Sequence, residues 1–107
     1  MLFFPRRYFQ QYLDDDGGDE ILALSARIGL ATCFDQQGQH AEAAAAYKSA
    51  AEADNFKSAE LYYAAARSSE LAGNLDQARS LLQKVVDDYP DSPVFSKAKS
   101  SLSELQG

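Results

Sequence analysis

The stretch FDQQGQHAEAAAAYKSAAEAD, residues 34–54, decides how the rest of this sequence is interpreted. Taken by itself it could be a low-complexity alanine tract. Further along, SELAGNLDQARSLLQKVVDDYP, residues 69–90, follows a similar outline. Gly38 in the first stretch stands 35 residues before Gly73 in the second, and alanines recur at the same spacing. Self-similarity at a fixed period of this length indicates a structural unit that is built twice.

Helical periodicity accounts for almost the whole chain. Apolar residues recur every three to four positions, and no segment alternates with period two, so we expect helices and no strand. Ser92 would cap the last helix and Pro93 would occupy its first position. The predicted helices span residues 3–14, 20–37, 41–53, 59–72, 75–89 and 93–106.

The composition is that of one globular domain of 107 residues, with 46% hydrophobic and 24% charged residues. The net charge of −6 argues against nucleic acid as a partner, because phosphate binding needs a basic face. Cys33 is the only cysteine, which rules out an internal disulfide and a cysteine-based metal site. No apolar run approaches the ~20 residues of a membrane span, and the first residues do not have the pattern of a signal peptide.

The acidic run DDDGGDE invites a calcium interpretation, which its spacing does not support. An EF-hand loop needs acidic residues at its positions 1, 3 and 5, glycine at 6 and glutamate at 12. When Asp14, Asp16 and Gly17 are placed in that register, position 1 is Tyr12 and position 12 is Ala23. The run is therefore interpreted as a solvated turn, and no metal site is expected.

A few residues of the sequence could carry a catalytic function. Cys33 and His40 could be a nucleophile and its base, but both stand where packing residues are expected, and the chain has one histidine. Asp87 and Asp88 close a helix and are expected to face water. No Gly-rich phosphate loop or zinc spacing occurs. We expect no catalytic residue and no cofactor, and an enzyme is the second alternative only.

Small and large residues recur at matching places in the two stretches. The first unit presents Leu30, Ala31, Phe34, Gly38, Ala43, Tyr47 and Ala50, and the second presents Tyr62, Ala65, Ala66, Gly73, Ala78, Leu82 and Pro90. Small residues would let antiparallel helices approach closely, and larger ones would fill the spaces between them. This pattern resembles the tetratricopeptide repeat. It departs from the family at Arg27, Ser69 and Asn55, where an aromatic residue, a tyrosine and a proline are typical.

The resemblance implies an all-α fold, a right-handed α-solenoid of antiparallel helix pairs with about six helices. Two full units would be flanked by half-repeats within a single domain, residues 1–107. The expected parts are a half-repeat at 3–17, repeat one at 20–54, repeat two at 57–90 and a capping helix at 93–106.

The N-terminal half-repeat carries an aromatic cluster that a missing helix would ordinarily cover. It indicates either a segment of a longer repeat protein or a homodimer formed through residues 2–13. The residues expected to self-associate are Phe3, Phe4, Tyr8, Phe9 and Tyr12.

In the family, the first helices of successive repeats line a concave groove that receives a peptide. Tyr63 and Arg67, one turn apart, have the composition of an interface. Ile28, Thr32 and Ala64 stand where some members carry residues that clamp a terminal carboxylate, which argues against a chaperone-tail adaptor. By position, the groove would be lined by Ser25, Ile28, Thr32, Asp35, Glu60, Tyr63, Arg67 and Glu70.

The expected function is a noncatalytic protein–protein interaction module that binds a protein or peptide through this groove. The first alternative is a purely structural solenoid segment with no groove ligand. The segment LLQKVVDDYPDSP resembles bacterial tetratricopeptide proteins of the cell envelope. This resemblance is compatible with the bacterial cytoplasm or the periplasm as the compartment, and it favours an association with the cell envelope.

Overall fold

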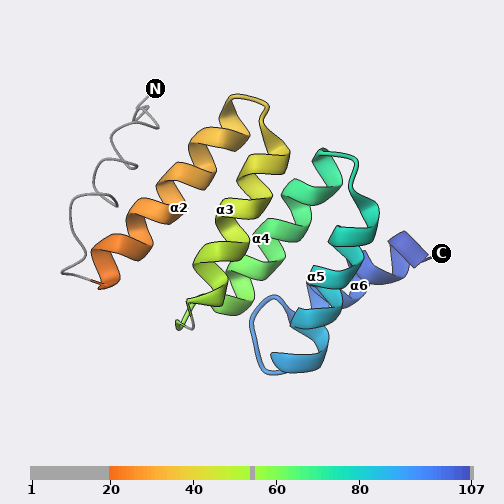
Figure 1. Ribbon diagram of the computed structural model, residues 1–107. Coiled ribbons are helices and arrows are strands. Elements are labelled where there is room, and N and C mark those ends of the chain that lie inside the picture. Colours follow the sequence, from red (N-terminus) through yellow and green to blue (C-terminus); the bar gives the residue numbers. More distant parts are fainter. Residues whose placement is uncertain (1–19, 54, 107) are drawn as a thin grey trace.

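The computed structural model describes residues 20–53 and 55–106 (Figure 1). The described residues form five helices and no strand. The helix predicted over residues 3–14 and the half-repeat at 3–17 lie outside them. The helices are α2 (Glu20–Gln36), α3 (His40–Glu52), α4 (Ser58–Leu71), α5 (Leu75–Asp88) and α6 (Phe95–Gln106). Each begins and ends within about two residues of the range that periodicity predicts.

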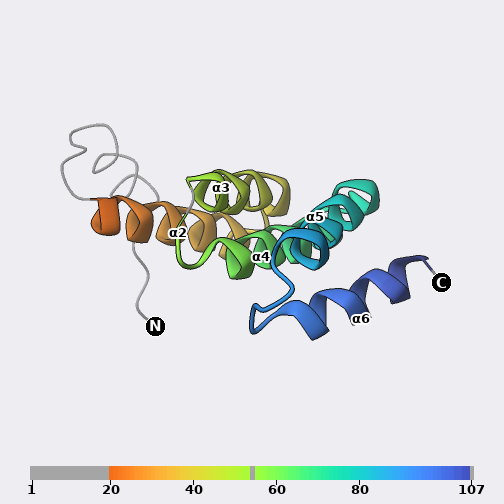
Figure 2. The same ribbon diagram turned by 90° about the horizontal axis from the view of Figure 1, so that it is seen from below.

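Consecutive helices run antiparallel and stack side by side along the molecule (Figure 1). Seen from below, α2, α4 and α6 lie on one side and α3 and α5 on the other (Figure 2). Each helix packs mainly against its neighbours in sequence, α2 on α3, α3 on α4, α4 on α5 and α5 on α6. This is the arrangement of an α-solenoid, so the predicted all-α fold is confirmed.

Alanines make the close approach between helices possible. Ala31, Ala43, Ala66 and Ala78, the predicted close-packing positions, are all fully buried. Larger side chains fill the space between them, and Leu82 is the largest that is fully buried. Burying a leucine side chain contributes about 1.5–3 kcal/mol, so these contacts help to hold the helix pairs together.

The turn between α2 and α3 and the turn between α4 and α5 have the same backbone conformation, and each contains a glycine. Gly38 has φ +80° and Gly73 has φ +83°, a left-handed conformation that glycine adopts without steric cost. In both turns the glycine N–H donates to the carbonyl three residues earlier. The next N–H donates to the carbonyl five residues before it, at 2.8 Å and 2.9 Å. These bonds satisfy the last carbonyls of α2 and α4.

The connection between α3 and α4 is held by hydrogen bonds from two side chains. The Asn55 amide donates to the carbonyl of Ala50 at 2.8 Å, and its oxygen accepts from the N–H of Lys57 at 2.8 Å. The Ser58 hydroxyl donates to the carbonyl of Ala51 at 2.8 Å and accepts from the N–H of Asn55 at 3.0 Å. The start of α4 is thereby tied to the end of α3.

The predicted start of the last helix is wrong by two residues. The chain makes two turns before α6: the N–H of Ser92 donates to Tyr89, and the N–H of Phe95 donates to the Ser92 carbonyl. The helix therefore begins at Phe95, and Pro93 lies in the turn. The Ser92 hydroxyl, expected to cap the helix, is buried with no hydrogen-bond partner in the described part of the chain.

Candidate functional site

The predicted groove residues of α4 lie on one stripe of that helix. Glu60, Tyr63, Arg67 and Glu70 are spaced three to four residues apart and none of them is buried, whereas both flanks of the helix are. Tyr63 packs partly against the core, and Arg67 is exposed. Among the described residues, Arg67 has no partner for an ion pair or a side-chain hydrogen bond. This stripe places a half-buried aromatic ring beside an exposed cation.

The corresponding residues of α2 lie in the same layer as α4 (Figure 2). Ser25 and Thr32 are exposed, and Ile28 is half-buried and packs against the core. Asp35, near the end of α2, is also half-buried, with 26% of its side chain exposed. The fold thus places both predicted sets on one side of the molecule, and their contact with a partner stays a prediction.

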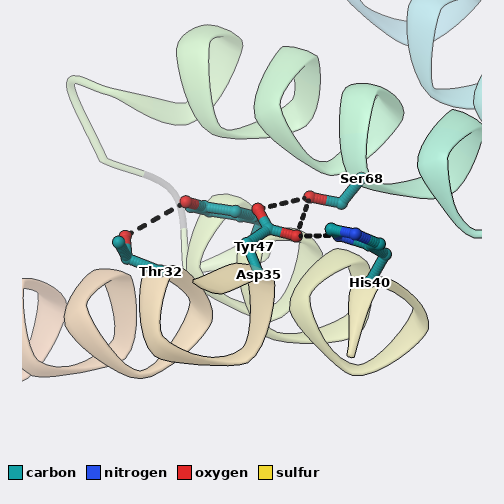
Figure 3. A network of polar contacts seen from close by, with 5 residues as sticks. All are labelled: Thr32, Asp35, His40, Tyr47 and Ser68. Atoms are coloured by element: carbon teal, nitrogen blue, oxygen red, sulfur yellow. Dashed lines mark hydrogen bonds and ion pairs between the residues drawn. The ribbon is translucent and has the colours of Figure 1, made fainter. Parts of the chain in front are cut away.

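Asp35 joins three helices through its carboxylate (Figure 3). Its Oδ1 lies 2.8 Å from Nδ1 of His40, at the start of α3. The hydroxyl of Ser68, in α4, lies 3.1 Å from Oδ1 and 2.9 Å from Oδ2. A carboxylate only accepts hydrogen bonds, so His40 and Ser68 are both donors. Ser68 is 1% exposed, and its hydroxyl obtains its partner from the preceding helix pair.

A second polar contact joins Thr32 of α2 to Tyr47 of α3 (Figure 3). The Thr32 hydroxyl lies 3.0 Å from the carbonyl of Ile28 and 3.1 Å from the Tyr47 hydroxyl. The carbonyl can only accept, so the single proton of Thr32 goes to Ile28 and Tyr47 donates to Thr32. The side chains of two predicted groove residues, Thr32 and Asp35, therefore already form hydrogen bonds within the protein.

Sequence reasoning missed these internal contacts for a simple reason. The partners of Thr32 and Asp35 lie 15 and 33 residues away, too far for helical spacing to reveal them. One signal was present, because Asp35 and His40 flank the turn at Gly38 and a tight turn brings its flanks together.

The group of Asp35, His40 and Ser68 has the residue types of a catalytic triad but a different order. In a triad the imidazole lies between the hydroxyl and the carboxylate, so that it can take the hydroxyl proton. Here the carboxylate lies between the other two groups, and the serine donates to it directly. The arrangement fixes three helices rather than activating a nucleophile. Cys33, the other nucleophile weighed, is 4% exposed, as a packing residue should be.

A further polar cluster closes the end of α5. Nζ of Lys84 lies 2.8 Å from Oδ2 of Asp88 and 5.7 Å from the centre of the Tyr62 ring, which also contacts Tyr89. The hydrogen bond and the charge of Asp88 raise the pKa of Lys84. Burial raises the pKa of Tyr62, against the opposing charge of Lys84. Asp87 is exposed and accepts from Gln83, so the two adjacent aspartates engage separate partners.

The described part of the chain contains no group of three or more His, Cys, Asp or Glu side chains that could hold a metal ion. None of the helices described is long and apolar enough to cross a membrane. The residues predicted to self-associate lie outside the described ranges; they are Phe3, Phe4, Tyr8, Phe9 and Tyr12.

Comparison with protein families decides what this succession of helix pairs is. A family model described as tetratricopeptide repeat matches residues 36–102, more than half of the chain. The chain belongs to the tetratricopeptide repeat family. The resemblance seen in the two stretches is thereby confirmed. No curated protein and no solved structure matches the chain. Tetratricopeptide repeats generally mediate protein–protein interactions, and the family is typically noncatalytic.

Two of this chain's departures from the tetratricopeptide pattern, Asn55 and Ser69, can be interpreted from the structure. Asn55 stands in place of the usual proline, and its side chain holds the connection between α3 and α4 with two hydrogen bonds. Ser69, in place of the usual tyrosine, is 1% exposed, and its hydroxyl has no partner among the described residues. A buried hydroxyl without a partner costs about 1–3 kcal/mol, so this position lowers the stability of the second helix pair.

Proposed function

We propose that this tetratricopeptide chain is a noncatalytic module that binds an extended or helical segment of a partner protein along the layer of α2 and α4. The observation that carries the proposal is Arg67, an exposed guanidinium one helical turn from Tyr63 and without an ion-pair partner among the described residues. Arginine and tyrosine are enriched where binding energy concentrates in protein interfaces. An acidic side chain of the partner opposite Arg67 and an apolar one against Tyr63 suit this pair.

The predicted groove residues divide into two roles under this proposal. Tyr63, Arg67, Glu60 and Glu70 form the contact stripe of α4, and Ile28 extends it onto α2. Thr32 and Asp35 are engaged by Tyr47, His40 and Ser68, so they act as positioning residues that hold the two helices at a set distance.

The structural alternative, a solenoid segment with no groove ligand, is supported by the same internal bonds. A face whose polar side chains are occupied with one another has fewer groups left for a partner. The two functions differ in one respect that can be measured, which is whether the exposed charge of Arg67 matters to any partner.

The test compares two charge reversals at exposed cations. Immobilised wild type, Arg67→Glu and Lys97→Glu are used to capture proteins, and each captured partner is then purified and titrated. Lys97 is the control, since it is exposed on α6 and makes no described ion pair. We expect Arg67→Glu to weaken a groove partner at least about tenfold, the effect of losing and reversing one well-placed charge pair, while Lys97→Glu leaves it unchanged. Equal affinity of every partner for all three proteins, with unchanged circular dichroism, would support the structural alternative.

A further inference from the structure

A pocket of about 410 Å³ opens at one edge of the solenoid, away from the centre of the contact stripe. It lies between the connection from α3 to α4 and the connection from α5 to α6, which run side by side at the lower edge of Figure 1. Its volume is within the range of ordinary ligand pockets, about 300–1,000 Å³. The lining residues that matter to its chemistry are Phe56, Glu60, Asp88, Tyr89, Asp91 and Ser92.

The wall on the α4 side is held in place before any ligand arrives. Asn55 and Ser58, which line the pocket, are tied by their side chains to the carbonyls of Ala50 and Ala51 at the end of α3. On the opposite wall the ring of Tyr89 contacts that of Tyr62, with ring centroids 6.1 Å apart. A preformed wall lowers the entropy cost of binding, because little has to be ordered when the ligand enters.

The pocket is lined by negative charge that the protein leaves largely unbalanced. Asp88 is paired with Lys84, at 2.8 Å. Glu60 and Asp91 form no ion pair with any residue in the described part of the chain. An anionic ligand would be repelled by both carboxylates, and an apolar one would displace their water without replacing its hydrogen bonds.

An exposed aromatic ring completes the lining. Phe56 is 79% exposed, so its ring is open to a ligand. Nζ of Lys57 lies 6.0 Å from the centre of this ring, so an incoming cation would compete with this ammonium for the ring. Cations are attracted to aromatic faces at this distance, and the attraction adds to that of nearby carboxylates.

We propose that this pocket binds an arginine side chain of a partner protein, with Glu60 and Asp91 accepting hydrogen bonds from the guanidinium and Phe56 stacking on it. Arginine fits better than lysine, since its planar group both stacks on aromatic rings and donates to two acceptors in fixed directions. The pocket is a second binding place, separate from the contact stripe around Arg67. Only Glu60, at the start of α4, belongs to both.

The test uses short peptides that differ in one group. The full chain is titrated with acetyl-Gly-Arg-Gly-amide and with the same peptide carrying citrulline, which has the shape of arginine without its charge. Amide chemical shifts are followed by NMR. We expect saturable shifts at residues 55–60 and 88–92 with the arginine peptide and none with citrulline. The affinity should fall as salt is raised, because the attracting charges lie near the surface.

Two double variants separate the pocket from the overall charge of the protein. Glu60→Gln with Asp91→Asn should weaken the arginine peptide about three- to tenfold, the loss of two charge pairs near the surface. Glu42→Gln with Glu104→Gln removes the same charge at exposed positions elsewhere and should leave the affinity unchanged.

The proposal would be overturned if the citrulline peptide bound as tightly as the arginine peptide, or if both double variants weakened binding equally. Shifts confined to the α2 and α4 stripe, or no shifts at all, would also overturn it. Arg67→Glu should not alter these titrations. A failure of groove binding and a failure of this pocket can therefore be told apart.

Discussion

Gly73 shows at the scale of a single residue what a repeat turn demands of the backbone. Its φ of +83° is a conformation that L side chains rarely adopt, and a Cβ built there would meet no atom within 4 Å. Space therefore does not prevent substitution. Whatever a substitution costs at this position comes from the backbone conformation alone.

This makes a prediction for Gly73 that depends on conformation rather than on packing. Gly73→Ala should lower the free energy of unfolding by about 1–2 kcal/mol, the cost of the left-handed region for an L side chain. Gly73→Asn should cost less, because asparagine tolerates that region. Urea unfolding followed by circular dichroism measures both. An alanine variant as stable as wild type, or an asparagine variant less stable than alanine, would contradict this explanation.

At the scale of elements, the bond between Asp35 and Ser68 ties the first helix pair to the second. Its donor lies on α4 and its acceptor on α2, and these two helices are not neighbours in sequence. Removing the carboxylate leaves the buried Ser68 hydroxyl without its partner, whereas removing the hydroxyl leaves Asp35 bonded to His40. The two single substitutions are therefore not equivalent.

A double-mutant cycle measures this connection between elements. Asp35→Ala should destabilise the protein by about 2–3 kcal/mol and Ser68→Ala by about 1 kcal/mol, since an orphaned buried hydroxyl costs more than a lost donor to a carboxylate that keeps another partner. The double variant should be less damaging than the sum by about 1–2 kcal/mol, the coupling energy expected for a hydrogen bond to a charged group. Urea unfolding of the four proteins provides the values, and additive effects would show that the bond contributes nothing.

The same elements show how far sequence reasoning reached into the candidate site. It placed Asp35 on the partner-binding face from its position in the repeat, and the structure shows that its carboxylate is already engaged. The spacing along α4 was sufficient to predict that Arg67 is exposed, because exposure on a single helix follows from periodicity. For Asp35 it was not, since its partners come from two other helices.

At the scale of the whole molecule, the described helices form a chain of neighbour contacts without a common centre. Each helix packs mainly on the one before it and the one after it. Stability in such an architecture is approximately a sum over units and their interfaces, so damage at one end need not reach the other.

Hydrogen exchange can show whether stability is local in this way. Leu82→Ala, at a position 1% exposed in α5, should cost about 2–5 kcal/mol and reduce amide protection in α5 and α6 more than in α2 and α3. Leu30→Ala, at a buried position in α2, is the matched variant and should produce the opposite distribution. Equal loss of protection in all five described helices for both variants would mean that they unfold as one unit.

The sequence by itself determined the helices, the two turns and the repeat, and with them the family. These features depend on contacts within one helix or across one tight turn, which spacing and residue type encode locally. The tertiary structure alone decided that Asp35 bonds Ser68 and that residues 55–60 and 88–93 enclose a pocket. Both depend on how one helix pair is rotated and displaced against the next. That geometry is the sum of many packing contacts along the solenoid, so no short stretch of sequence encodes it.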